Sequence, residues 1–260
     1  MKRIPIPIFL FCILLLSGCA TADLFPKDLE VTPDAAEQGK MLLLQSMQKR
    51  DPQDHWSQLT FMKVVARDNW ESQTARLFTL IPQASQQVQF AFNLTNDDAY
   101  MKFLEGDQNG NAIGIEDGVT YFVTRGKREE KTSKRVDSYL PPVKNYFLWP
   151  QTIHNLKNIV YLGEEDLGLR RYYKIFASNG DDFTGGAEDQ YIIWVNRQTL
   201  HIEYIEFDLK ELVKAYHGVV QYREYRDVDG VLLPHEITLL DGLETLSFSH
   251  KFYVQIQTLQ

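Results

Sequence analysis

The sequence of 260 residues has only two cysteines, Cys12 and Cys19, and both lie near its beginning. The chain beyond them therefore has no thiol for a disulfide, for a Cys–His catalytic pair or for a cysteine metal site. It also lacks an excess of positive charge, since its formal net charge is −8. Proteins that bind nucleic acid normally present a basic face to the phosphates, so nucleic acid is excluded as a partner.

Motifs that carry catalysis or bind metals are also missing. No Gly-x-Ser-x-Gly sequence is present, and Gly185-Gly186 lacks the lysine of a phosphate loop. Asp107-Gln-Asn-Gly-Asn111 matches the opening of a calcium loop, but Gly118 stands where the bidentate glutamate is required, so Asn109-Gly110 is better explained as a hairpin turn. We expect no metal and no cofactor, because the histidines share no ligand spacing: His55, His154, His201, His217, His235 and His250.

Long apolar runs are limited to one stretch of 13 residues, Ile4 to Leu16, which is shorter than the ~20 residues that a membrane-spanning helix needs. Lys2 and Arg3 precede it, which is the layout of a secretory signal peptide. The next residues, Leu16-Ser17-Gly18-Cys19, resemble the bacterial lipobox. This resemblance implies that Cys19 takes up diacylglycerol and becomes the new N-terminus after cleavage. The alternative is a plain signal peptide with a chance cysteine.

These features predict three regions: a signal peptide at 1–18, a lipidated tether at 19–31 and one folded domain at 32–260. Each buried acyl methylene contributes about 0.8 kcal/mol, so two or three chains on Cys19 would hold the protein firmly on a membrane. By resemblance to Gram-negative sorting rules, Ala20 in place of aspartate after the cysteine implies the outer membrane of the cell envelope.

The folded part is predicted to begin with a helix. Thr32 is a suitable N-cap with Pro33 at the first helical position, and Asp51-Pro52 ends the helix near Arg50. Met41, Leu44 and Met47 are expected on one face of it, with Leu42 and Leu43 beside them.

From Trp56 onward the sequence is dominated by strand patterns. Val88 to Leu94 and Phe248 to Ile256 alternate strictly between apolar and polar residues, with His250 on the apolar side of the second strand. Turn sequences such as Asp229-Gly230 separate the other candidates: 59–67, 74–81, 99–105, 119–124, 159–163, 171–177, 191–195, 200–207, 219–225 and 232–239. A mostly β (α+β) fold is predicted, with a large curved antiparallel sheet or half-open barrel. Ser138–Pro150 is expected to form a short helical or irregular lid.

The sequence resembles the LolA/LolB lipoprotein-localisation superfamily. The resemblance covers about residues 33 to 256 and is most specific in three segments of the second half: Val160–Ile175, Asp189–Leu200 and Tyr225–Ile237. It implies an incomplete antiparallel barrel around an apolar cavity that accepts acyl chains and needs no catalytic group.

The aromatic content, 12% of the chain, fits either such a cavity or an ordinary filled core. We therefore expect a non-enzymatic, membrane-anchored protein with an acyl-chain or lipoprotein client. The residues expected around its cavity are Phe61, Phe78, Phe90, Phe92, Phe147, Trp149 and Trp194. Two alternatives stay open. One is a structural or interaction lipoprotein with a filled core, and the other is a hydrolase with a dispersed site.

Overall fold

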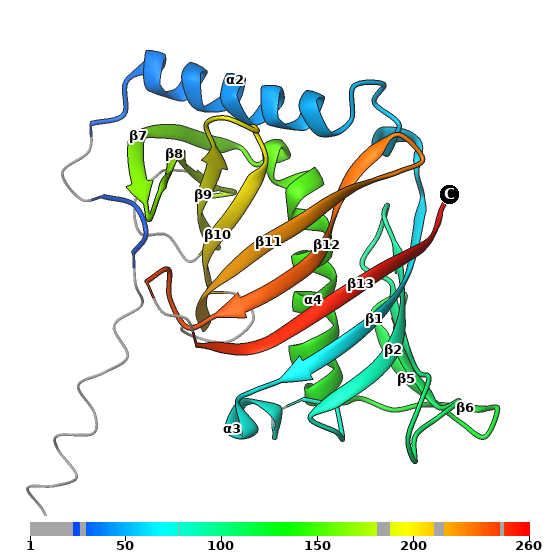
Figure 1. The fold of residues 1–260 in the computed structure, drawn as a ribbon. Helices are drawn as coiled ribbons and strands as arrows, with labels where there is room; N and C mark the ends of the chain where they lie inside the picture. The colour runs from blue at the N-terminus through cyan, green and yellow to red at the C-terminus, as the bar shows by residue number, and fades with distance from the viewer. Residues whose placement is uncertain (1–22, 27–29, 78, 181–187, 211–215, 245–246) are drawn as a thin grey trace, which may run out of the picture.

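The computed structural model describes residues 23–26, 30–77, 79–180, 188–210, 216–244 and 247–260. These residues form one thirteen-stranded antiparallel sheet with helices on its concave face and at one end (Figure 1). The helices are α2 (Pro33–Arg50), α3 (Gln73–Arg76) and α4 (Lys134–Thr152), with 3-10 turns η1 (Trp56–Gln58) and η2 (Ile153–Asn155). The strands are β1 (Phe61–Trp70), β2 (Ser85–Asn93), β3 (Ala99–Phe103), β4 (Ala112–Glu116), β5 (Val119–Thr124), β6 (Lys127–Glu130), β7 (Asn158–Leu167), β8 (Arg170–Ser178), β9 (Gln190–Asn196), β10 (Ile202–Leu209), β11 (Tyr216–Val228), β12 (Val231–Leu240) and β13 (Phe248–Leu259).

The strand order explains where α4 lies. The order in the sheet is β6-β5-β4-β3-β2-β1-β13-β12-β11-β10-β9-β8-β7. The chain thus starts in the middle, moves out to one edge at β6, and resumes at the opposite edge with β7. Helix α4 is the connection between these edges, so it crosses the inner side of the curved sheet (Figure 1). The edge strands β6 and β7 do not pair with each other, and the predicted half-open antiparallel fold is confirmed.

Helix α2 begins and ends where the sequence predicts. The Thr32 hydroxyl accepts a hydrogen bond from the backbone N–H of Ala35, and Asp51 is the C-cap. Its packed face differs from the expectation: Leu42 and Leu43 are buried, whereas Met41 and Leu44 are 50% and 45% exposed. The reason is a close contact with β7 through a glycine. A Cβ added to Gly39 would lie 2.8 Å from the backbone nitrogen of Tyr161, so the helix turns this side toward the sheet.

Three segments differ from the strand predictions. Residues 74–81 are not a strand, since α3 and a loop connect β1 to β2, which pair directly as neighbours and leave no position for a strand between them. Strands β4 and β6 were not predicted. The segment expected to be a short lid is a regular helix of 19 residues, even though it contains Pro141, Pro142 and Pro150.

Pro150 is tolerated in α4 because another side chain replaces its missing donor. Pro150 has no N–H to bond the carbonyl of Tyr146, four residues earlier. The buried hydroxyl of Tyr222 on β11 donates to that carbonyl at 3.0 Å instead. Burial raises the pKa of Tyr222 well above its usual value, so the hydroxyl keeps its proton. This hydrogen bond fixes α4 to the sheet.

Replacing Gly39 by alanine is expected to destabilise the protein. The substitution gains about 1 kcal/mol of helix propensity, but forcing a methyl group against the β7 backbone costs about 1–3 kcal/mol. Urea unfolding should therefore show a lower midpoint for Gly39→Ala. Gln38→Ala, at the exposed neighbouring position, is the matched control and should stay close to wild type. A Gly39→Ala protein more stable than wild type would contradict the contact.

Tyr222→Phe is expected to cost about 1–3 kcal/mol, because it removes the hydroxyl that donates to the buried carbonyl of Tyr146. In a Pro150→Ala background the new N–H can bond that carbonyl, so the same substitution should cost clearly less. Urea unfolding of the four proteins in this double-mutant cycle measures the difference. Equal costs in both backgrounds would show that the hydroxyl does not replace the proline's missing donor.

Candidate ligand-binding pocket

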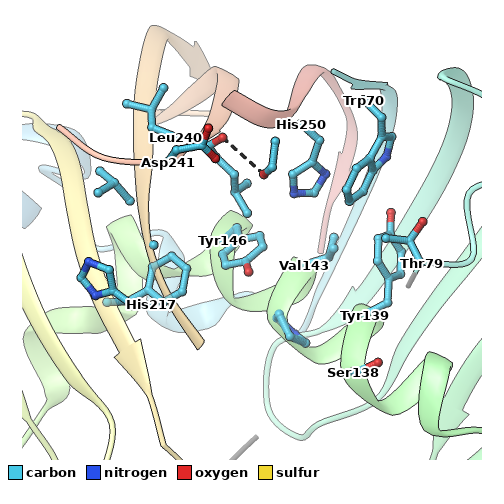
Figure 2. A pocket seen from close by; sticks show the side chains of 16 residues that line it. Trp70, Thr79, Ser138, Tyr139, Val143, Tyr146, His217, Leu240, Asp241 and His250 are labelled. Atoms are coloured by element: carbon cyan, nitrogen blue, oxygen red, sulfur yellow. Dashed lines mark hydrogen bonds between the residues drawn. The ribbon is translucent and has the colours of Figure 1, made fainter. Parts of the chain in front are cut away.

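A partly open pocket of ≈ 550 Å³ lies between α4 and the concave face of the sheet. Its buried walls come from two sources. Helix α4 contributes Tyr139, Pro142, Val143 and Tyr146, and the sheet contributes Phe207, Val219, Leu239 and His250. Exposed polar residues Ser138, His217 and Asp241 lie at the rim. Figure 2 shows Trp70, Tyr139 and His250 on one side of the pocket and His217 on the other.

A buried carboxylate organises one wall of this pocket. Asp68 occupies an inward-facing position near the end of β1 and is fully buried. Its Oδ2 accepts hydrogen bonds from Trp70 Nε1 at 2.8 Å and from the Tyr139 hydroxyl at 3.1 Å. Its Oδ1 lies 3.2 Å from Nδ1 of His250 on β13. A buried charge is tolerated when it is fully hydrogen-bonded, and the three donors around Asp68 meet this condition.

The three side chains that contact Asp68 also line the pocket. The rings of Trp70 and His250 lie with centroids 3.9 Å apart. Burial and the negative charge of Asp68 raise the pKa of Tyr139 well above its usual value, so its hydroxyl stays protonated and donates to the carboxylate. The result is a rigid polar wall in a cavity whose floor is otherwise apolar.

The opposite, convex face of the sheet carries a separate aromatic cluster. Phe25 packs edge-on against Phe176, with ring centroids 5.0 Å apart, and both belong to a buried group with Tyr172, Ile192 and Trp194. The backbone N–H of Leu24 donates to the side-chain oxygen of Gln190 at 2.8 Å. Residues 24 and 25 are thus docked on the sheet, whereas the sequence was interpreted as a plain tether there.

The structure gathers some of the predicted cavity residues but does not put them on this pocket. Phe90, Phe92 and Phe147 lie together in the core, where the ring centroids of each pair are 5.6 Å apart or less. Trp149 packs behind the pocket wall against Tyr146 and Phe207, while Trp194 belongs to the convex cluster and Phe61 is half-buried at the start of β1. None of these six is among the residues that line the pocket. Phe78 and Cys19 lie outside the described residues.

Sequence reasoning missed the residues of the polar wall, although part of a signal was present. His250 shares the inward-facing positions of β13 with Phe252 and Val254. Asp68 likewise continues the inward series of Met62, Val64 and Ala66 on β1. A carboxylate and an imidazole at inward positions of two strands would have suggested a buried pair, had the pairing of β1 with β13 been known.

In the part of the chain that the structure describes, no helix combines the length and the apolar composition needed to cross a bilayer. In the same residues no group of histidine and carboxylate side chains is arranged to hold a metal ion.

Comparison with known proteins shows similarity in fold. No protein-family model matches the sequence, and no curated protein is significantly similar to it. Among solved structures, an outer-membrane lipoprotein-sorting protein domain from Vibrio parahaemolyticus is 11% identical, covers 86% of this chain and 92% of its own, and gives a TM-score of 0.52. A DUF1329 family protein from Desulfovibrio piger is 11% identical over 87% and 92% of the two chains, with a TM-score of 0.51. A LolA superfamily protein from Nitrosomonas europaea is 13% identical over 85% and 92%, with a TM-score of 0.49.

The chain has a LolA-like fold. The structures with TM-scores above 0.5 match nearly the whole of the described sheet and its helices, so the fold implied by the sequence resemblance is confirmed. Fold alone does not give a function. What the protein binds depends on the residues that line the pocket.

Proposed function

We propose that the protein binds the acyl chain of a lipid or lipoprotein in the pocket between α4 and the sheet. The observation that carries this proposal is the pocket itself, ≈ 550 Å³ of space beside buried Val143, Phe207 and Leu239. This volume is in the range of small-molecule binding sites, ~300–1,000 Å³. Burying hydrocarbon there contributes a binding free energy of about 25 cal/mol per Å² of apolar surface, so binding needs no catalytic group.

The fold supports the same proposal at a coarser level. The similar domain from Vibrio parahaemolyticus is described as a lipoprotein-sorting protein. Together with the lipobox at Leu16–Cys19, this favours a role in the bacterial envelope, with the chain anchored through lipid on Cys19. Ala20 favours the outer membrane as the site of anchoring. We assign no enzymatic activity to the protein.

Filling the pocket should prevent chain binding without unfolding the protein. Leu240 is half-buried and lines the pocket, so Leu240→Trp places a large side chain in the cavity at a position with room to adjust. We expect its affinity for a fluorescent acyl probe to fall roughly tenfold. Val119→Trp, on an exposed site of β5, adds the same side chain outside the pocket and should bind as wild type. Equal binding by both variants would mean that the chain is held elsewhere.

Lipid attachment is tested by labelling cells with a palmitate analogue. Cys19→Ala should abolish labelling and leave the chain at its precursor mass, because the thiol that receives diacylglycerol is gone. Cys12→Ala removes the other cysteine and should label normally. Ala20→Asp should keep the label but move the protein from the outer to the inner membrane fraction. Labelling of Cys19→Ala would refute the lipobox assignment.

A further inference from the structure

Hydroxyl groups of the pocket lining already donate to the protein. The Thr79 hydroxyl bonds the carbonyl of Arg76 at 2.8 Å, and the Tyr139 hydroxyl bonds Asp68 at 3.1 Å. The Ser138 and Ser249 hydroxyls lie 3.4 Å from the carbonyls of Arg135 and Leu239. The oxygens of all four keep lone pairs for a ligand.

His250 provides another acceptor, and its hydrogen bond with Asp68 determines which ring nitrogen accepts. A carboxylate oxygen accepts hydrogen bonds, so Nδ1 of His250 is the donor in the bond to Oδ1 of Asp68. In the neutral imidazole, Nε2 then has a lone pair and no proton. Nε2 has no hydrogen-bond partner among the described residues, and the ring lines the pocket.

A second acceptor lies on α4. Pro142 has no N–H, so the carbonyl of Ser138 lacks the helical partner four residues further on. Ser138 and Pro142 both line the pocket. The lining therefore includes one acceptor on β13 and one on α4.

Charge and volume restrict the ligand further. None of the sixteen described lining residues is lysine or arginine, and the rim has the carboxylate of Asp241, so an anionic head group meets no Lys or Arg among these sixteen residues. At about 30 Å³ for each water-sized group, ≈ 550 Å³ has room for about 18 such groups. That is enough for one acyl chain of membrane-lipid length.

We propose that the pocket selects a neutral single-chain amphiphile whose head group donates hydroxyl hydrogen bonds, such as a monoacylglycerol or a fatty alcohol, to Nε2 of His250 and the carbonyl of Ser138. The hydrocarbon chain lies along Val143 and Tyr146 of α4 toward Phe207. This inference rests on the proposed function, because it names the ligand of the same pocket.

The test compares ligands that share one saturated chain and differ in head group. The full chain, purified after expression in its host envelope, is titrated with a fluorescent acyl probe. The probe is then displaced by the 1-monoacylglycerol, the primary alcohol, the methyl ester, the alkyl phosphate and the two-chain diacylglycerol. We expect the monoacylglycerol and the alcohol to bind roughly three- to tenfold more tightly than the methyl ester, which has no hydroxyl to donate. The phosphate and the diacylglycerol should bind more weakly than the monoacylglycerol.

An Asp68→Asn variant tests the role of His250. The asparagine oxygen can replace Oδ2 and keep the bonds from Trp70 and Tyr139, while its NH2 group faces Nδ1 of His250. Nδ1 then has to accept, so the proton moves to Nε2, which becomes a donor toward the pocket. The preference for alcohol over ester should shrink, because the carbonyl of Ser138 is then the remaining acceptor for the hydroxyl hydrogen. Asp241→Asn is the same change at a rim carboxylate and should keep the preference.

The outcomes separate the two proposals. If no member of the series displaces the probe, the proposed function fails and the ligand class fails with it. If the ester binds as tightly as the alcohol in wild type, or the phosphate or diacylglycerol binds most tightly, the pocket holds a chain but the head-group inference is wrong. An undiminished alcohol preference in a folded Asp68→Asn protein would also overturn it. The wild-type series decides the ligand class even when the variant does not fold.

Discussion

The packing of α4 into the concave face of the sheet determines how much space the fold leaves open. The helix fills most of this face with Phe147 and Trp149, whose rings contact core aromatics from both halves of the sheet. Along the first half of α4 the side chains do not fill the concave face, and the pocket lies there beside Tyr139 and Val143. The same helix therefore both stabilises the sheet and bounds the cavity. Any widening of the cavity requires α4 to shift against the strands.

The fold was largely readable from the sequence because its local patterns are strong. Alternation in β2 and β13, the N-cap at Thr32 and the Asp-Gly turn at Asp229 each act over a few residues. Predictions failed where long-range contacts decide the structure. Residues 74–81 have apolar positions but lie in a connection between two paired strands, and Pro150 in α4 is tolerated through a tyrosine 76 residues away from the carbonyl that it leaves unbonded.

The site was less predictable for a related reason. Aromatic residues were expected to border the cavity because large apolar side chains often do. In this protein Phe90, Phe92 and Phe147 contact one another and fill space instead. The residues that give the pocket its character, Asp68 and His250, are 182 positions apart. Their meeting depends on strand order in the sheet, which no local pattern in the sequence specifies.

The docking of Phe25 on the convex face has a mechanical consequence for a chain lipidated at Cys19 as proposed. The reach from the lipid to the domain is set by the four steps from Cys19 to Asp23, since Leu24 and Phe25 are already held by the sheet. Four extended residues span at most about 14 Å. The domain would therefore stay against the bilayer surface and turn only within a narrow range of orientations. Strands β8 and β9 would be the part of the sheet nearest the lipid.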